Sequence, residues 1–318
     1  MARRRWTTLP GGPSTTPRAH LFLFHGTHEH CGRYAEFADR CNQRGILVFS
    51  FDFHGHGLRE GIRGDFGKLD DAVSEAIELV NSERAAAPAT PDVPLIIMGH
   101  SLGSMVAFLV AHELATTAEL PTPSLCVLSG FAMDSVSPPF GVKALVPVLR
   151  AMPSAIHKIV TVLAALQPHG PACPLPHASE LTHDAQQAAL ALNDPLHFHG
   201  WIQNRTGLAL MDARARCTAL LPVWGRDFPF LMVHGGADEL CPRSACESVL
   251  ASSPQRDKNL KVFPGLFHEI LFESPEARKQ VHEYILDWME PRIAAGASSS
   301  ATSTAGAAGS GVVLRSRL

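Results

Sequence analysis

The sequence lacks long apolar runs, paired cysteines and a strong net charge, and each absence excludes a class of protein. No apolar stretch approaches the roughly 18 residues of a membrane-spanning helix, and no signal-peptide core follows the first residues. The 7 cysteines include no C-x-x-C pair, so we expect reduced thiols in an intracellular protein, with neither a disulfide framework nor a metal site. The net charge of −3 gives no sign of a nucleic-acid partner.

The composition is that of a globular protein with a sizeable core. Hydrophobic residues make up 46 % of the 318 residues, and charged residues make up 18 %. This is enough apolar material for one large α/β domain or two ordinary ones. No internal repeat is evident, and we expect no cofactor. The oligomeric state cannot be read from the sequence.

One short segment has the pattern of a catalytic turn. The apolar run 94–98 indicates a buried strand, Gly99-x-Ser101-x-Gly103 follows it, and residues 104–116 are apolar at helical spacing. Strand, tight turn and helix are the setting of a nucleophile elbow, in which a strained turn exposes a serine hydroxyl. The helix N-terminus adds free N–H groups at the reaction centre. We therefore predict that Ser101 is a nucleophile; a plain glycine-rich turn is the alternative.

Strands alternate with helices along most of the chain, which predicts a mostly parallel, doubly wound sheet with helices on both faces. The expected strands are 20–24, 46–51, 94–98, 125–129, 228–234 and 260–263, and the expected helices are 34–44, 69–87, 104–116, 243–252 and 276–289.

The alternation stops between residues 134 and 221, and we interpret this segment as a helical cap over the site. It is dense in Pro and Ala and shows no strand pattern. Its helical pieces are expected at 142–150, 154–167 and 185–192. The other expected parts are a disordered or truncated segment at 1–18, a core formed by 19–133 and 222–293, and a flexible low-complexity tail at 294–318.

Two further residues complete a candidate triad. A serine hydroxyl needs a base to take its proton and a carboxylate to orient that base. Asp238 and His268 each follow the carboxyl end of an expected strand, in the order Ser, Asp, His that α/β-hydrolases use. We predict Asp238 as the acid and His268 as the base. The alternatives are Glu239 as the acid, Asp238 as a helix cap, and His268 as one of 17 histidines on the surface.

The oxyanion of an ester intermediate needs two fixed N–H donors. One is expected from Leu102, which follows the nucleophile directly. The other is expected from the loop after the first strand, and we assign it to Thr27. An ordinary strand-to-helix turn is the alternative reading of that loop.

Several motifs resemble those of monoacylglycerol lipases. They are HGTHEHCGRY at 25–34, DFHGHG at 52–57, GHSLG at 99–103, NDPL at 193–196, GADELC at 236–241 and the segment around His268. The match runs from about residue 19 to residue 292. The resemblance implies an α/β-hydrolase fold with the cap inserted after the sixth strand. It also implies a serine hydrolase that cleaves monoacylglycerols to fatty acid and glycerol through an acyl-enzyme.

By the same resemblance, Glu29 and Arg33 lie near the glycerol end of the pocket; a surface ion pair is the alternative. The residues of the 52–57 motif are expected to fix a turn rather than to catalyse. Cys241 lies three residues after Asp238, so its thiol is expected near the site as a substrate contact, with inert packing as the alternative.

Two departures from the family pattern affect the prediction. The family has a β-hairpin ahead of the first strand, and residues 1–18 leave little room for it, so a sheet edge is expected to be less covered. The cap is the least similar part, which leaves acyl length and head group open. A lysophospholipase or general carboxylesterase is the nearest alternative, followed by a peptidase and a non-catalytic binding module of the same fold.

Two segments suggest where the protein acts. The apolar cap segment 140–166 is divided by prolines into short helices, so it is expected either to contact a membrane surface or to pack internally. The chain ends in Ser316-Arg317-Leu318, similar to the Ser-Lys-Leu type of peroxisomal address. We therefore expect a peroxisomal or related organelle, and the cytoplasm otherwise.

Overall fold

A seven-stranded sheet forms the centre of the molecule. The computed structural model describes residues 7–8, 16–86, 93–134 and 153–307. The strands of this sheet are β1 (Thr7–Thr8), β2 (Ala19–Phe24), β3 (Ile46–Ser50), β4 (Leu95–His100), β5 (Leu125–Ser129), β8 (Phe230–Gly235) and β9 (Lys258–Phe263). Their order is β1-β3-β2-β4-β5-β8-β9, and β1 is antiparallel to β3 whereas the other pairs are parallel. The prediction of a mostly parallel sheet is confirmed.

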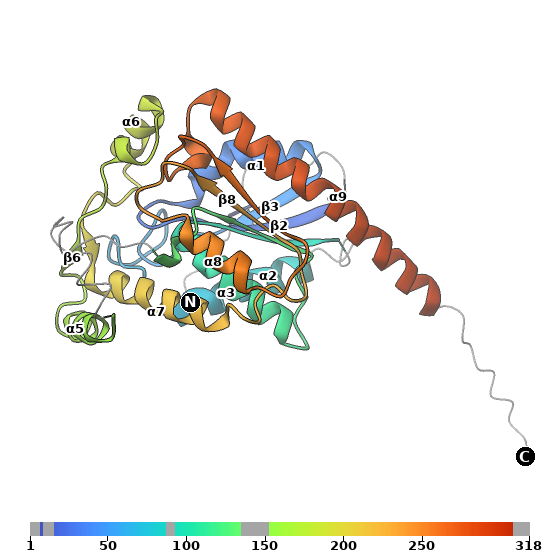
Figure 1. The fold of residues 1–318 in the computed structure, drawn as a ribbon, viewed down its shortest axis with the longest axis horizontal. Helices are drawn as coiled ribbons and strands as arrows, with labels where there is room; N and C mark the ends of the chain where they lie inside the picture. Colours follow the sequence, from blue (N-terminus) through green and yellow to red (C-terminus); the bar gives the residue numbers. More distant parts are fainter. Residues whose placement is uncertain (1–6, 9–15, 87–92, 135–152, 308–318) are drawn as a thin grey trace, which may run out of the picture.

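Helices cover both faces of this sheet (Figure 1). One face carries α1 (Ala35–Gln43) and α9 (Pro275–Ala307), and the other carries α2 (Leu69–Ala86), α3 (Leu102–Thr116) and α8 (Ser244–Ser252). Short 3₁₀ segments are η1 (Cys31–Tyr34), η2 (Ala132–Asp134), η5 (Ala178–Glu180) and η6 (Ile270–Phe272). Among the described residues, no helix is both long enough and apolar enough to cross a membrane.

The two faces explain why the strands read as continuous apolar runs. In β2, Phe22 and Phe24 pack in the cluster under α2 and α3, whereas Leu21 and Leu23 pack in the cluster under α1 and α9. All four side chains are fully buried. A parallel sheet buried on both sides needs apolar residues at every position, so it lacks the alternation of a half-exposed strand.

The cap lies beyond the carboxyl ends of the strands. Its elements are α5 (Pro153–Leu166), β6 (Pro171–Cys173), α6 (Ala185–Asn193), β7 (Ile202–Gln203) and α7 (Asn204–Leu220). The helices predicted at 154–167 and 185–192 are confirmed, and the piece predicted at 142–150 lies outside the described residues. The cap follows β5, the fifth strand along the chain, and not a sixth, because β1 is the one strand described before β2.

Two features of the cap differ from the prediction. The prediction that the cap contains no strands is wrong, because β6 and β7 pair as a small antiparallel sheet. Both strands are too short to show a period-2 pattern. Helix α7 was not predicted. Its buried stripe consists of the small residues Ala209, Ala213 and Cys217, spaced four apart, and they pack in the same cluster as α3.

Both chain ends contain more structure than predicted. Thr7 and Thr8 pair with Ser50 and Phe49 of β3, so the disorder predicted for residues 1–18 is wrong for these two residues and the sheet edge is covered there. Helix α9 continues to Ala307, although a flexible tail was expected from residue 294. The alanines of that segment have the highest helix propensity, and a helix already started by its packed first turns is easily extended.

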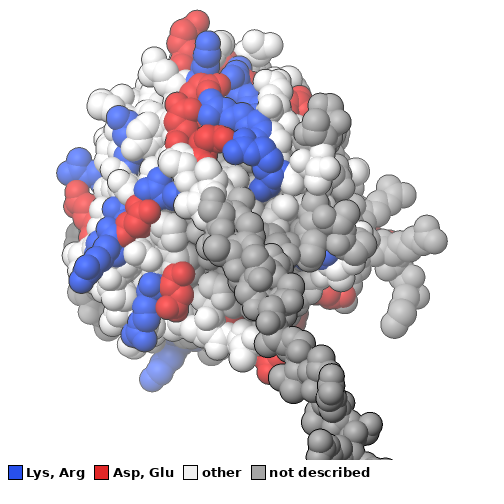
Figure 2. Space-filling view, turned by 90° about the vertical axis from the view of Figure 1, so that its right-hand side faces the viewer, with Lys and Arg blue, Asp and Glu red and all other residues white. Residues whose placement is uncertain are grey.

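On one face of the molecule, acidic and basic side chains are mixed (Figure 2). Figure 2 shows acidic and basic side chains next to one another on the face that it presents. Between α1 and α9, Arg40 pairs with Glu283 at 3.3 Å and Arg44 pairs with Asp287 at 2.6 Å. These ion pairs connect helices from opposite ends of the chain.

Candidate active site

Ser101 occupies a strained turn between β4 and α3. Its φ is 53° and its ψ is −121°, in the left-handed half of backbone space that disfavours a side chain. A Cβ on Gly99 would lie 2.0 Å from the Gly103 carbonyl oxygen, and a Cβ on Gly103 would lie 2.1 Å from that of Phe24. Only glycine fits at either position. The Ser101 side chain makes no capping bond to α3, so its hydroxyl is available for chemistry.

The loop after β2 contacts this turn. A Cβ built on Gly26 would lie 3.2 Å from the Ser101 Cβ. In this loop, His28 has a φ of 66°, and among the described non-glycine residues only His28 and Ser101 have a positive φ. Such strain concentrates at functional sites because surrounding contacts must hold it in place. The His28 carbonyl accepts a hydrogen bond from the Phe198 N–H of the cap at 3.0 Å.

His268 and Asp238 form a buried hydrogen-bonded pair. His268 Nδ1 lies 2.8 Å from Asp238 Oδ2, and Asp238 Oδ1 accepts the N–H groups of Leu240 and Cys241 at 2.9 Å each. The Asp238 side chain is fully buried. An acceptor on Nδ1 places the ring proton there, which leaves Nε2 free to act as a base. Asp238 does not cap α8, and His268 is not a surface residue, so neither structural alternative holds.

The surroundings shift the pKa values of this pair in opposite directions. Burial lowers the pKa of His268, but Cys241 and Asp238 outweigh burial and raise it well above its usual value. Burial raises the pKa of Asp238, but His268 and two backbone N–H groups outweigh burial and lower it. The pair therefore favours an ionised Asp238 beside a strongly basic imidazole.

Cys241 lies directly beside the pair, as its spacing predicted. The donor atoms of Asp238, Cys241 and His268 all lie within 4.8 Å of one another. Burial raises the pKa of the Cys241 thiol, and the neighbouring His268 opposes that shift. Because His268 Nδ1 already faces Asp238, the Asp238–His268 pair is arranged for proton transfer rather than for metal ligation.

Leu102 directly follows Ser101, and Thr27 lines the same cavity as Ser101. Leu102 is the first residue of α3, where an N–H group has no acceptor within the helix. Thr27 follows Gly26 and lines the cavity in front of Ser101. The structure thus brings together the five residues that the sequence analysis assigned to chemistry, from the loops after β2, β4, β8 and β9.

A cavity of about 540 Å³ extends from Ser101 into the cap. Ser101, His268, Thr27 and Cys241 line its core side. The apolar residues on its cap side include Ile156, Val160, Leu175, Leu181, Leu210 and Met211. Polar cap side chains, among them His177, His199 and Arg214, also line the cavity, but the chamber is mainly apolar and fits a substrate with a hydrocarbon chain and a polar reacting group.

Glu29 and Arg33 form part of a buried network, and the alternative of a surface ion pair is wrong. Arg33 Nη1 donates to Glu29 Oε2 at 2.6 Å, and the Arg33 guanidinium donates twice to Glu269, at 2.9 and 2.8 Å. Their side chains are 5–14 % exposed. Glu29 and Glu269 line the main cavity, whereas Arg33 lines a second cavity of about 440 Å³ behind it. No sequence pattern pointed to Glu269, although it directly follows His268.

The 52–57 motif fixes a turn, as predicted. Asp52 Oδ1 accepts the Cys31 N–H and Asp52 Oδ2 accepts the Leu58 N–H, both at 2.8 Å. Behind the turn, His56 Nδ1 lies 2.7 Å from the His54 carbonyl oxygen. These residues hold the loops after β2 and β3 together and do not line the main cavity.

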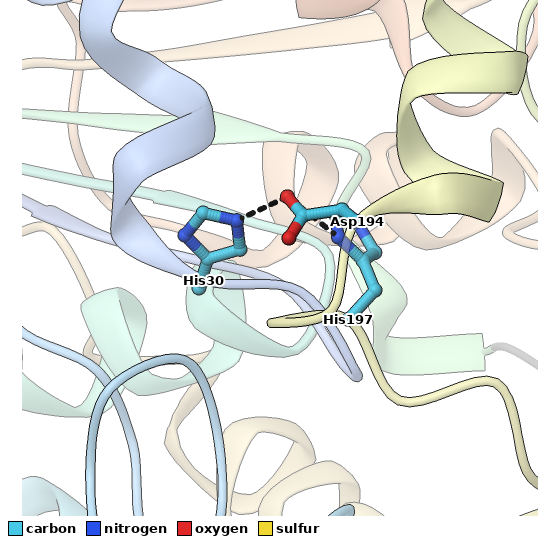
Figure 3. Close-up of side chains that lie close together, drawn as sticks. All are labelled: His30, Asp194 and His197. Atoms are coloured by element: carbon cyan, nitrogen blue, oxygen red, sulfur yellow. Dashed lines mark hydrogen bonds and ion pairs between the residues drawn. The ribbon is translucent and has the colours of Figure 1, made fainter.

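His30, Asp194 and His197 form a second cluster with metal-ligand chemistry (Figure 3). His30 Nε2 lies 2.8 Å from Asp194 Oδ2, and His197 Nδ1 lies 3.4 Å from the same oxygen. However, His30 Nδ1 accepts the Gly32 N–H at 3.2 Å, so the ring proton is on Nε2 and occupies the position that a metal would need. We interpret the cluster as a hydrogen-bonded connection between cap and core, with Asp194 contributed by the NDPL motif.

Comparisons with known proteins agree with this geometry. The family model Hydrolase_4, described as "Serine aminopeptidase, S33", matches residues 15–275. Rat monoglyceride lipase is 32 % identical over 289 residues, covering 89 % of this chain and 86 % of the relative. Monoacylglycerol lipase of Mycolicibacterium smegmatis is 33 % identical over 282 residues, covering 87 % and 90 %.

Solved structures give the same fold at lower identity. Monoacylglycerol lipase of Paleococcus ferrophilus superposes with a TM-score of 0.72 at 23 % identity, over 91 % of this chain and 98 % of that one. A soluble variant of monoglyceride lipase from Saccharomyces cerevisiae, in complex with a substrate analog, gives 0.74 at 19 %, over 90 % and 91 %. The match of the family model to most of the chain, together with these relatives, shows that the chain belongs to the serine aminopeptidase S33 family of α/β-hydrolases and is an ester hydrolase.

Proposed function

We propose that the enzyme cleaves monoacylglycerols to fatty acid and glycerol. The observation that carries this proposal is the cavity of about 540 Å³, because Ser101 and His268 line it together with many apolar residues of the cap. An acyl chain fits such a chamber, and its ester carbonyl would reach Ser101. The curated relatives named above as monoglyceride and monoacylglycerol lipases support the same substrate.

In the proposed mechanism, Ser101 attacks the ester carbonyl while His268 Nε2 takes the hydroxyl proton. The N–H groups of Thr27 and Leu102 stabilise the negative oxygen of the tetrahedral intermediate. His268 then gives its proton to the glycerol oxygen, which leaves an acyl-Ser101 ester. Water, deprotonated by the same imidazole, attacks that ester, and the imidazolium returns the proton to Ser101 Oγ as the bond to the acyl group breaks and the fatty acid leaves. Asp238 orients the ring and stabilises its charged form.

A substrate panel tests this proposal. We expect the highest kcat/KM with a long-chain monoacylglycerol, and lower values with a diacylglycerol, a lysophosphatidylcholine and a short p-nitrophenyl ester. Faster cleavage of the lysophospholipid would instead assign a lysophospholipase. Alanine p-nitroanilide tests the aminopeptidase named in the family description. We expect no cleavage of it, because Arg33 already engages Glu29 and Glu269, the two carboxylates that could hold a free amino group.

We also propose that α5 docks on a lipid surface. Its side chains Ile159, Val162, Leu163 and Leu166 are 57, 56, 40 and 75 % exposed, and their spacing puts them on one helix face. On the same helix, Ile156 and Val160 line the cavity. A helix with one face in lipid and another in the cavity would let a monoacylglycerol pass from a bilayer to Ser101 without crossing water.

Vesicle binding tests the docking proposal. The double variant Val162→Asp, Leu166→Asp should lose sedimentation with phosphatidylcholine vesicles and lose activity on vesicle-bound substrate. Its activity on a soluble p-nitrophenyl ester should stay within about twofold of that of the parent. Val223→Asp is the matched control. Val223 is also an exposed apolar residue, at 39 %, but it follows the end of α7 and belongs to the core domain and not to the cap. Unchanged vesicle binding by the double variant would contradict the proposal.

For localisation, we propose import into a peroxisome-type organelle through Ser316-Arg317-Leu318. Helix α9 extends away from the sheet (Figure 1), which supports access to a segment attached beyond it. A fluorescent protein fused ahead of residues 294–318 should accumulate in organelles, and removal of Leu318 should make it diffuse. Diffuse signal from the intact segment would contradict the proposal.

A further inference from the structure

We propose that Arg33 is a positioning residue that sets the oxyanion loop against the loop carrying His268. The proposal rests on the roles given above to Thr27 and His268 in ester cleavage. It concerns the Arg33 network, defined as Glu29, Arg33, Tyr34 and Glu269. No member of this network other than Glu29 and Glu269 lines the main cavity in the described part of the chain.

The guanidinium of Arg33 is held as a planar fork. One nitrogen, Nη1, donates both to Glu29 Oε2 and to Glu269 Oε1, and Nη2 donates to Glu269 Oε2. Its Cζ lies over the Phe272 ring, 3.9 Å from the ring centre. A lysine ammonium is a point charge with no plane, so it cannot reproduce three bonds and a stacking contact together. The geometry therefore depends on arginine and not on positive charge alone.

On one side, the network reaches the proposed oxyanion donor. Glu29 Oε1 accepts the Gly26 N–H at 2.5 Å and the Tyr34 hydroxyl at 2.6 Å. Gly26 directly precedes Thr27, and the Gly26 backbone has no side chain to restrict it. The bond from Glu29 thus holds the residue whose rotation would turn the Thr27 N–H away from the substrate. Arg33 and Tyr34 in turn hold the Glu29 carboxylate.

On the other side, the network reaches the catalytic base. Glu269 directly follows His268, and its N–H donates to the Leu181 carbonyl of the cap at 2.8 Å. Strand β2 leads into the oxyanion loop and β9 into the His268 loop, and β4, β5 and β8 lie between these two strands in the sheet. No sheet hydrogen bond therefore connects the two loops directly. The Arg33 side chain forms hydrogen bonds to both loops, through Glu29 in the first and Glu269 in the second.

The charges in the network also require Arg33. Two carboxylates and one guanidinium, all buried, leave a net charge near −1 beside the site where the oxyanion forms. Burial raises the pKa of Glu29, but Arg33 outweighs burial and lowers it, so Glu29 stays ionised and accepts its three bonds. Without Arg33, two buried carboxylates would repel each other, and at least one would move or take a proton.

Kinetics on a p-nitrophenyl ester test the positioning role. Arg33→Met should lower kcat by on the order of 100-fold, because small displacements of catalytic groups cost about that much, with KM within about threefold. The kcat of Arg33→Lys should exceed that of Arg33→Met by less than about tenfold, so most of the loss should remain. Arg40→Met is the matched control: Arg40 pairs with Glu36 and Glu283 on the surface of α1, and kcat should not change.

A double variant separates position from charge. In Glu29→Gln, Arg33→Met, the amide can still accept the Gly26 N–H, and the unpaired charge is removed, but the bond to Glu269 remains absent. We expect kcat to stay at least about 20-fold below that of the parent. Full recovery would overturn the positioning role and leave charge compensation alone. A normal kcat for Arg33→Met would overturn the proposal outright.

Two measurements protect the test from misfolding and from a wrong substrate. Circular dichroism and thermal denaturation show whether each variant folds, and Glu269→Gln, which keeps the Arg33–Glu29 bond, should lower kcat by about tenfold if Arg33→Met does not fold. A normal kcat for Glu269→Gln would also overturn the proposal. Parent enzyme that cleaves the p-nitrophenyl ester but no monoacylglycerol would contradict the proposed substrate and leave the Arg33 test valid.

Discussion

The core and the cap bury their side chains to very different degrees. Helix α3, directly after Ser101, buries residues on all sides, from Leu102 to Leu114. Helix α6 of the cap buries only Ala188 among its nine residues, and α5 exposes several large apolar side chains. The core thus holds the reacting groups at fixed positions, whereas the cap supplies an apolar wall whose residues can change at little cost to the fold. Substitutions in the two regions should therefore separate chemistry from substrate choice.

The largest expected effect comes from the core position Ser101. Ser101→Ala removes the proposed nucleophile without adding volume to the tight turn, so kcat should fall by about 10⁶-fold while the protein stays folded. Steady-state kinetics and thermal denaturation check both parts. Covalent labelling of this variant by a fluorophosphonate would show that another residue is the nucleophile.

The second largest effect on kcat is expected from replacing the proposed acid, Asp238. Asp238→Asn should lower kcat by about 10⁴-fold, because an amide at this position no longer fixes the His268 tautomer or balances its charge. Glu239→Gln is the matched control, since Glu239 is the neighbouring carboxylate in the same loop, and kcat should stay within about threefold. The reverse result would assign the acid to Glu239.

A cap substitution should change selectivity rather than chemistry. Val160 lines the cavity from α5, and Val160→Phe shortens the space left for an acyl chain. We expect kcat/KM for a long-chain monoacylglycerol to fall by about 10-fold to 100-fold relative to that for a butyryl ester, because a few displaced methylenes are worth that much. A uniform loss with both esters would mean that the cap also positions the catalytic groups.

Replacing Cys241, which lines the cavity from the core, should have a smaller effect on kcat. Cys241→Ser should keep kcat within about threefold, because the thiol is not part of the proposed proton transfer. In a Cys173→Ser background, chosen because Cys173 also lines the cavity, a maleimide should inhibit the parent slowly, since Cys241 lies beside His268 but has a raised pKa, and should not inhibit the variant. Full labelling of Cys241 with unchanged activity, shown by mass spectrometry, would support inert packing.

The smallest expected effect is a dependence of stability on pH that arises in the core. Burial lowers the pKa of His20, His100 and His282 to about 4, against 6.5 in the unfolded chain. The unfolded state therefore binds more protons at these three positions below pH 6.5, so their contribution to stability is complete above that pH and is lost as the pH falls toward 4. Tm should decrease by several degrees between pH 7 and pH 5, and His282→Gln should reduce that decrease.

Local patterns predicted the residues of the proposed triad, and long-range contacts could not be predicted. Ser101, Asp238 and His268 each follow a strand, and parallel strands bring their carboxyl ends to one edge whatever their separation in sequence. The Arg33–Glu269 bonds join residues 236 positions apart, from strands that are not neighbours in the sheet. No local spacing encodes such a contact, so Glu269 remained undetected.

The cap was the harder region for a related reason. Secondary structure is read from the periodicity of large apolar side chains, and the cap buries few of them. Helix α7 has small buried residues such as Ala213, and β7 consists of Ile202 and Gln203 alone. Neither gives a periodic signal strong enough to detect.

The length of α9 has a practical consequence for handling the enzyme. The helix starts at Pro275, packs along the sheet and leaves the body of the protein before Ala307, on the side away from α5 and α6 (Figure 1). An enzyme immobilised through a linker placed after Ala307 would therefore direct its cap toward the solution. Attachment at that point should give beads or electrodes whose bound enzyme still meets emulsified lipid.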